Sequence, residues 1–383
     1  MPWKETTPME ERMWFVMQAK EGLFPIGELC RRYGISRKTA YKWLERFGQQ
    51  GVEGLQDRSR APQRIPHKTW LQVADKLAQA RLKHPGWGAR TLLQWLQRKD
   101  DSERWPAAST AHEILKRRSL IQARRKRRPR EAMRRVYGVQ TERPNQVMTI
   151  DFKGEFRMQN RDYCYPLTVA DHFSRRLHGC EALGSTCGRG VRRKLESIFR
   201  EQGLPEAMLS DNGPPFAATG LSRLSRLSVW WMRLGIQPLL IQPGRPEQNG
   251  RHERMHRTLK QQTARPPAAN LRNQQESFDR FLAEYNEERP HQALDWKTPS
   301  ELYEPSERSY PSRLPAVEYP GHYEVRKVSS SGRIKLRNQA YFLSLVLEAE
   351  QVGPEEVDDG IWSIYLGPFR IGRLDDRHGR VNG

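Results

Sequence analysis

Residues 146–154 read QVMTIDFKG, and this stretch decides the fold of the region around it. Asp151 lies between Ile150 and Phe152 in a run with the apolar character of a buried β-strand. A carboxylate inside such a strand is costly unless it is paired with a cation or binds a metal ion. The stretch therefore predicts a strand that carries a charged site.

The sequence that follows alternates between strand-like and helix-like segments. Short apolar runs bounded by turn residues predict strands, and apolar residues at helical spacing predict helices. The expected strands are 146–154, two within 163–183 around Asp171, 207–213 and 235–243, and the expected helices are 190–203, 223–235, 246–262 and one within 277–294. These elements predict an α/β fold for residues 139–305, with a five-stranded mixed sheet and helices on its faces.

Two further carboxylates stand where elements of this region end or begin. Asp211 ends a short strand and precedes a turn, whereas Glu253 starts a helix after a loop rich in Pro, Gly and Asn. Carboxylates that converge from distant parts of a sequence suit hard cations such as Mg²⁺ or Mn²⁺. Two such ions, about 3.5–4 Å apart, support in-line phosphoryl transfer. Taken singly, Asp151 could be a salt-bridged core residue and Asp211 a turn residue.

Residues 252–256 read HERMH, which has the H-E-x-x-H spelling of zinc peptidases. His252 and His256 are one helical turn apart, as zinc ligands of that class are. Candidates for a third ligand are Glu276, Glu284, Glu287 and His291, so the spacing alone leaves this alternative open. A zinc site would leave Asp151, Asp211 and the charge of the chain unexplained.

Charge is the strongest global signal in this sequence. The chain has 66 Lys and Arg residues against 45 Asp and Glu, a net charge of +21 that favours a polyanion, first of all nucleic acid. An anionic membrane surface is the second candidate, but no amphipathic basic helix with a broad apolar face supports it. No apolar run approaches the ~20 residues of a membrane span, and no signal peptide is evident. The four cysteines form no C-x-x-C pair, which fits a reducing cytoplasm.

Residues 1–58 contain a helix-turn-helix pattern. In 26–48, a helix and a sharp turn at Tyr33-Gly34-Ile35 precede a second helix, for which Ser36 is the expected N-cap. A second helix that opens with polar and basic residues is typical of DNA recognition. The expected DNA-binding residues are Ser36, Arg37, Lys38, Thr39, Tyr41 and Lys42. An ordinary helical hairpin is the alternative.

Three further segments complete the predicted organisation. Residues 68–122 predict a second helix-turn-helix-like domain, with a helical bundle that serves only packing as the alternative. Residues 123–138 form a basic linker arm that is expected to follow DNA phosphates. Its expected DNA-binding residues are Arg124, Arg125, Lys126, Arg127 and Arg128. Residues 318–383 alternate apolar and polar positions around Gly turns, which predicts a small all-β barrel or sandwich that contacts DNA or a protein partner.

The motifs around the three acids together resemble the core of DDE insertion-sequence transposases, the retroviral-integrase-like class. These motifs are TIDFKG, LSDNGPPF, PGRPEQNGRHERMHRTLK and the later segment YNEERPHQAL. The N-terminal helix-turn-helix units and the basic arm match bacterial members of that family. The resemblance implies an RNase H-like fold, with Asp151 bridging two Mg²⁺ or Mn²⁺ ions and Asp211 and Glu253 each completing one site.

The same resemblance implies DNA contacts and a reaction. Lys260 lies seven residues after Glu253 on the same helical face as Arg257, and both, with Asn249, are expected to contact DNA. An ordinary solvent-exposed lysine is the alternative for Lys260. The implied reaction is metal-dependent cleavage of transposon-end DNA and strand transfer into target double-stranded DNA. A homo-oligomer, dimer or larger on DNA, is expected because two ends must be held together.

The sequence departs from the family pattern at two places. The 41 residues between Asp211 and Glu253 exceed the commonest spacing, and AATGLSRLSRLSVW (217–230) has the character of an extra loop and helix turn. The N-terminus lacks the His/Cys zinc module of retroviral integrases, and helix-turn-helix units take its place. A non-catalytic DNA-binding regulator derived from a transposase is the main functional alternative, and we expect a bacterial, nucleoid-associated cytoplasmic protein.

Overall fold

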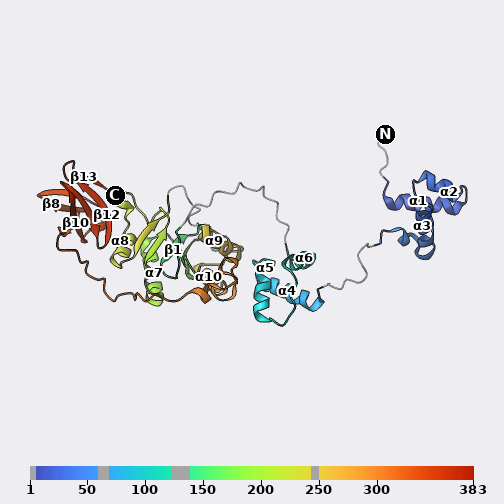
Figure 1. Ribbon diagram of the computed structural model, residues 1–383, viewed down its shortest axis with the longest axis horizontal. Coiled ribbons are helices and arrows are strands. Elements are labelled where there is room, and N and C mark those ends of the chain that lie inside the picture. Colours follow the sequence, from blue (N-terminus) through green and yellow to red (C-terminus); the bar gives the residue numbers. More distant parts are fainter. Residues whose placement is uncertain (1–5, 59–68, 122–138, 243–249) are drawn as a thin grey trace. The chain divides into compact units, whose positions relative to one another are not determined.

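The computed structural model describes residues 6–58, 69–121, 139–242 and 250–383 (Figure 1). The chain forms two compact units, residues 1–68 and 69–383. In the part of the chain that is described, no helix is both long and apolar enough to cross a membrane. The first unit is helical, and the second contains a helical group, an α/β core and a C-terminal β domain.

The first unit contains the predicted helix-turn-helix. Its elements are α1 (Pro8–Glu21), α2 (Ile26–Arg32), α3 (Arg37–Gln50) and the 3-10 helix η1 (Gly51–Leu55). Gly34 makes the turn between α2 and α3 at φ 61°, a conformation that favours glycine. Ser36 caps α3, because its Oγ accepts a hydrogen bond from the Thr39 backbone N–H at 3.2 Å. Phe15, Leu29 and Trp43 meet in the core of this unit.

The second unit begins with three helices. They are α4 (Leu71–Lys83), α5 (Ala89–Lys99) and α6 (Ala108–Arg117), as the sequence predicts. Their apolar faces pack together around Leu77, Trp87, Leu92 and Leu115. The amphipathic spacing of these residues is what allows three short helices to share a core.

The α/β core is built on a mixed sheet. Its strands are β1 (Val147–Phe152), β2 (Phe156–Arg157), β3 (Tyr163–Asp171), β4 (Leu177–Leu183), β5 (Ala207–Ser210) and β6 (Gln237–Leu240). Strands β1, β3 and β4 pair antiparallel, whereas β5 and β6 run parallel to β1. The five predicted strands all form, and the sixth described strand, the two-residue β2, pairs with the start of β3. This is an RNase H-like arrangement, which confirms the predicted fold class.

Helices cover both faces of this sheet, and side chains of β1 alternate between them. Met148 and Ile150 pack under α7 (Gly188–Gln202) and α8 (Arg226–Arg233). Helices α9 (Gly250–Thr263) and α10 (Leu271–Ala283) share a second apolar cluster with β3 and β4. Thr149 and Asp151 contact histidines of α9, which places them on that second face.

The segment YNEERPHQAL closes the α9 and α10 side of the core. Helix α10 continues into a π-helical turn, η4 (Glu284–Glu288), followed by η5 (Gln292–Leu294) and η6 (Pro299–Leu302). Buried Asn286 clamps β4, because its amide accepts from Leu177 N at 2.9 Å and donates to Leu177 O at 2.8 Å. This pair of bonds fixes the π-helical turn against the sheet.

The C-terminal domain is all-β, as predicted. Strands β10 (Gln351–Asp358), β11 (Ile361–Leu366), β12 (Phe369–Asp375) and β13 (Arg380–Asn382) form a meander with β7 (Arg326–Lys327) at its edge. A separate hairpin consists of β8 (Arg333–Leu336) and β9 (Gln339–Phe342), and the short helix η7 (Leu345–Leu347) follows it. Leu336, Tyr341 and Trp362 belong to the core that the two sheets share.

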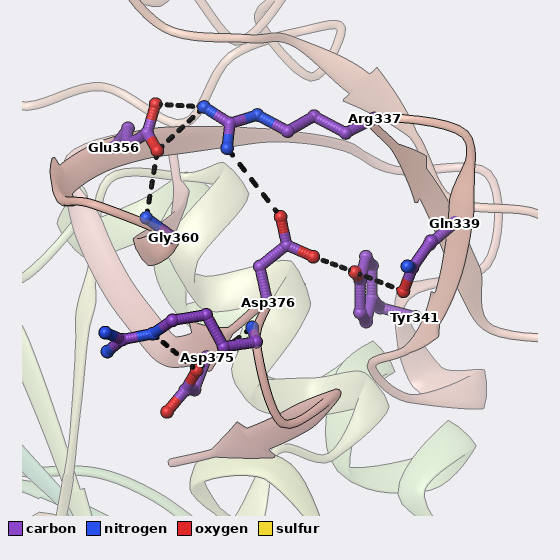
Figure 2. A network of polar contacts seen from close by, with 8 residues as sticks. Arg337, Gln339, Tyr341, Glu356, Gly360, Asp375 and Asp376 are labelled. Carbon is purple, nitrogen blue, oxygen red and sulfur yellow. Dashed lines mark hydrogen bonds and ion pairs between the residues drawn. The ribbon is translucent and has the colours of Figure 1, made fainter.

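A polar network joins the hairpin to the larger sheet (Figure 2). Arg337, in the turn of the hairpin, forms an ion pair with Glu356 of β10 at 2.6 Å. The Tyr341 hydroxyl donates to Asp376, just beyond β12, and Arg337 also approaches that carboxylate at 3.9 Å. The Arg337 guanidinium lies 5.1 Å from the centre of the Trp362 ring. The network therefore orients the hairpin over the shared core.

The extra segment between Asp211 and Glu253 docks this β domain on the α/β core. It forms the 3-10 helix η2 (Leu221–Arg223) and leads into α8. Leu221, Leu224 and Met232 belong to the same apolar cluster as the β domain. Ser222 donates from its Oγ to the backbone oxygen of Ile371 in β12 at 2.6 Å. The unusual length of this region is thus used to attach the C-terminal domain.

We expect Leu221→Ala to loosen this attachment. Removing a buried leucine from a packed interface costs about 2–5 kcal/mol, and Leu221 is buried in the interface cluster. Hydrogen–deuterium exchange of β12 and η2 should accelerate, whereas exchange of β1 should not change. Val357→Ala is the matched control, because that side chain is 49% exposed. Equal effects of the two substitutions would contradict the docking role.

Candidate functional site

Parallel pairing of β1 and β5 brings the first two candidate acids to one edge of the sheet. Thr149 lies opposite Leu209, and two residues further along each strand come Asp151 and Asp211. Carboxyl ends of parallel strands meet at the same edge, so both carboxylates lie there. Glu253 is on the exposed side of the first turn of α9, close enough to Asp151 for its charge to act on that residue. The structure therefore brings the three predicted acids together.

Two of the three acids, Asp151 and Asp211, have raised pKa values. Burial and the neighbouring carboxylate of Asp211 raise the pKa of Asp151 to about 7, and Glu253 adds to that rise. Burial also raises the pKa of Asp211, although a hydrogen bond from Gly213 N at 3.3 Å opposes this. Such mutual repulsion among carboxylates is what a bound cation relieves.

His252 and His256 point into the core and hold α9 on the sheet. The Nε2 atoms of both imidazoles lie 2.6 Å from the Oγ1 of Thr168 in β3. The Nδ1 of His252 lies 2.9 Å from the Oγ1 of Thr149 in β1. Burial lowers the pKa of His252 to about 3 and that of His256 to about 2, so both rings are neutral.

One arrangement of protons satisfies this network. The Thr168 hydroxyl donates to the Asp151 backbone oxygen at 3.2 Å and accepts from the Nε2–H of both histidines. The Nδ1 of His252 then accepts from Thr149, which shares its single hydroxyl proton with the Ala170 backbone oxygen at 3.2 Å. The Nδ1 of His256 faces the Asp151 carboxylate at 3.8 Å. Since β1 and β3 pair Asp151 with Thr168, the anchor lies directly beside the acid.

These contacts decide whether His252 and His256 are zinc ligands or core residues. His252 has both ring nitrogens bonded to threonines, and the two histidines are buried whereas Glu253 between them is exposed. The three side chains therefore do not converge as a zinc-peptidase triad would. The histidines are core residues that position the helix carrying Glu253.

Two contacts near the acids were not predicted from the sequence. Lys153, two residues after Asp151, is the cation that acts to lower the pKa of that acid. Arg223 of the extra segment donates to Asn212 Oδ1 at 2.8 Å, and Asn212 donates to Ile241 O at 2.7 Å. Asn212 is next to Asp211, so the segment that docks the β domain also restrains the loop of this acid. The D-F-K-G spelling could have indicated Lys153, whereas no local signal marks Arg223.

The described residues contain no ready-made metal cage. In the ranges that the structure describes, no group of three His, Cys, Asp or Glu side chains is placed to hold a metal ion. The donor chemistry of the acid cluster nevertheless fits a hard cation, since carboxylate oxygens are its preferred ligands. The buried like charges at Asp151 and Asp211 add to that fit.

The predicted DNA-binding residues lie in three places. On α3, Arg37, Lys38, Tyr41 and Lys42 are exposed, whereas Ser36 and Thr39 bond to each other at the helix start. On α9, Arg257 and Lys260 are exposed on the Glu253 side. Asn249 and the arm residues Arg124, Arg125, Lys126, Arg127 and Arg128 lie outside the described residues.

Comparison with known families matches this organisation. Residues 141–246 and 234–299 match families described as "Integrase core domain". Residues 11–63 match a "Helix-turn-helix domain" and residues 39–115 a "Homeodomain-like domain". The chain therefore contains an integrase core domain that follows an N-terminal helix-turn-helix domain. The helix-turn-helix match covers the N-terminal region in which the sequence predicts that motif.

Insertion-element proteins are among the relatives. The chain is 29% identical over 160 residues to the insertion element IS407 uncharacterized 31.7 kDa protein of Burkholderia multivorans, covering 42% of this chain and 55% of that protein. It is 23% identical over 189 residues to the IS476 uncharacterized 39.2 kDa protein of Xanthomonas euvesicatoria, covering 49% of this chain and 48% of that protein. The chain thus spans about half the length of these curated relatives.

A solved retroviral structure is also similar in part. The cryoEM structure of a simian T-cell lymphotropic virus intasome with the PP2A regulatory subunit B56 gamma matches 75% of this chain and 91% of that chain. The sequence identity is 15% and the TM-score is 0.39.

We expect Thr168→Val to destabilise the α/β core. Valine keeps the shape but removes the hydroxyl, which leaves two buried imidazole nitrogens without a partner, at about 1–3 kcal/mol for each group. Thermal denaturation should show a lower midpoint, and α9 should exchange its amide hydrogens faster. Thr168→Ser keeps the hydroxyl and is the control. A Val variant as stable as the Ser variant would show that the hydroxyl does not anchor α9.

The raised pKa of Asp151 gives a pH-dependent prediction. The folded chain holds this proton up to about pH 7, whereas the unfolded chain releases it near 3.8, so the contribution to stability falls as pH rises across that window. Asp151→Asn should therefore become more stable relative to the unmodified chain between pH 4 and pH 8. The gain should reach a few kcal/mol, at about 1.4 kcal/mol per pKa unit. Thermal denaturation in EDTA measures it, and a pH-independent difference would refute the assignment.

Proposed function

We propose that this protein is a DDE transposase that cleaves transposon-end DNA and transfers the strand into target DNA. Residues 1–58, 68–122 and the basic arm 123–138 bind DNA in this proposal. Residues 139–305 carry out the chemistry, and residues 318–383 form a β domain attached to that core. The working form is a homo-oligomer, dimer or larger, because two DNA ends must be held together.

A single observation carries this proposal. Three carboxylates from β1, the end of β5 and the start of α9 gather at one edge of an integrase-type core, and the charges of Asp211 and Glu253 both act on Asp151. Carboxylates that crowd together at the cost of mutual repulsion are typical of sites that bind cations. Such perturbed acids indicate a functional site.

Mg²⁺ or Mn²⁺ fits the proposed role of these acids, with two ions per site. The charges of both other acids act on Asp151, which would contribute to both ions, whereas Asp211 and Glu253 would each complete one. Bound ions of this kind supply an activated nucleophile and stabilise the charge of the leaving oxygen. No covalent intermediate between protein and DNA is needed.

The residues of this chain supply position and charge in the proposed mechanism. Thr168 and the two histidines fix α9, so Glu253 is held at a constant distance from β1. The Asn212 and Arg223 contacts restrain the loop after Asp211. On the exposed side of α9, Arg257 and Lys260 would contact DNA phosphates beside the acids. On α3, Arg37, Lys38, Tyr41 and Lys42 would contact DNA in the manner of a recognition helix.

Substitution of the acids tests the proposal. Purified protein with its flanking DNA ends should cleave and join DNA in Mg²⁺ or Mn²⁺. Asp151→Asn, Asp211→Asn and Glu253→Gln should each lower the rate at least ~100-fold, which corresponds to ~2.7 kcal/mol of transition-state stabilisation. Binding of the DNA ends, measured by fluorescence anisotropy in EDTA, should persist.

Glu181→Gln is the control, because this β4 carboxylate pairs with Lys194 at 2.7 Å and is not one of the three acids. Unchanged cleavage in all three acid variants would show that the acids are assigned wrongly. DNA binding without any cleavage by the unmodified protein would support the alternative of a non-catalytic DNA-binding regulator.

A further inference from the structure

A cavity of about 250 Å³ lies beside the acid cluster, between α9, the turn joining β3 to β4 and the π-helical turn η4. His252 and Thr149 form part of its wall, but neither Asp151 nor Glu253 does. The cavity is therefore a neighbour of the acids and not part of their cluster.

Five arginines line this cavity. They are Arg175, Arg251, Arg254, Arg257 and Arg289. Among the described residues, none of these guanidinium groups forms an ion pair with a carboxylate within 4.0 Å, although many other arginines of the chain do. Like charges gathered without counter-ions repel each other, and an anion would relieve that repulsion.

The acid on the wall does not neutralise these cations. Asp171 is the acidic residue that lines the cavity, and its oxygens accept hydrogen bonds from Asn145 N at 2.8 Å and from Ser174 N and Oγ at 2.7 Å. These hydrogen bonds hold the Asp171 carboxylate within the turn between β3 and β4. The positive charge of the five arginines therefore exceeds the negative charge of the cavity wall.

Arg175, in the turn between β3 and β4, and Arg289, after η4, are half-buried residues of the cavity wall. The Arg175 Nε is buried without a hydrogen-bond partner, and its backbone has φ 63°, a conformation rare for residues other than glycine. Burial lowers the pKa of Arg175, and the charges of Arg251 and Arg254 act in the same direction. Arg289 follows the π-helical turn and lies 5.9 Å from the ring centre of Tyr285. Among the described residues, the Arg175 Nε therefore lacks an acceptor that a ligand in the cavity could supply.

We propose that this arginine-lined cavity binds a phosphate group. Guanidinium groups present paired N–H donors that match phosphate oxygens, and several of them converge here from three separate elements. The phosphate comes either from the DNA backbone or from a free phosphate compound. The DNA source rests on the proposed function, whereas binding of a free phosphate compound does not require that the acids cleave DNA.

Inorganic pyrophosphate is the probe for the free ligand. Isothermal titration of the full chain in low salt should show saturable binding, and Arg254→Gln with Arg289→Gln should weaken it at least tenfold. The matched control is Arg226→Gln with Arg272→Gln, which removes the same charge from exposed positions outside the cavity. Arg289→Lys keeps the charge but not the fork, so it should retain part of the affinity.

Chemical protection in the unmodified chain makes the test independent of variant folding. Phenylglyoxal modifies accessible arginines, and mass spectrometry locates the products. Pyrophosphate should slow modification of Arg254 and Arg289 but not of Arg272, which lies on α10 outside the cavity. Equal protection of all three would show only general charge screening and would overturn the proposal.

Duplex DNA is the probe for the backbone source. The steepness of log Kobs against log salt concentration falls by about 0.9 for each DNA phosphate that the protein no longer neutralises. The cavity variant should show that reduction relative to the matched control if DNA occupies the site. Pyrophosphate binding with an unchanged slope assigns the site to a free phosphate compound. If both readouts are equal in the two variants, the cavity is not a phosphate site.

Discussion

The hydroxyl of Thr168 is the contact on which the arrangement of the acids depends. It joins the backbone of Asp151 to His252 and His256, which lie on either side of Glu253 in the sequence. A strand acid and a helix acid, about a hundred residues apart in the chain, are thereby held in one place. Because burial keeps both imidazoles neutral, salt does not weaken their bonds to Thr168.

Charges of opposite sign are concentrated in two neighbouring regions of the core. Carboxylates repel one another at Asp151 and Asp211, and arginines repel one another around Arg175. Both clusters cost stability, which the large apolar clusters on the two faces of the sheet offset. In the functions proposed here, a cation would relieve the first cost and a phosphate group the second.

Much of the fold follows from local pattern. The alternating and helical periods predicted the five longer strands and the helices that cover them, and Ser36 and Gly34 marked the turn before α3. Strand β10 was harder to predict, because Pro354 and three acidic residues break its apolar pattern. Its place in the sheet comes from pairing with β11, a contact that no local window contains. The structural role of the 217–230 segment is likewise seen only in its contacts with the β domain.

The sequence by itself indicated the three candidate acids, and it determined the type of core that carries them and the basic character of the whole chain. Those properties reside in residue identity and spacing, which a single chain displays directly. Only the tertiary structure decided the roles of the histidines in HERMH, the partner of Asn212 and the convergence of five arginines on one cavity. Side-chain direction and contacts between distant segments decide such roles, and helical spacing alone could not separate a zinc ligand from a core anchor.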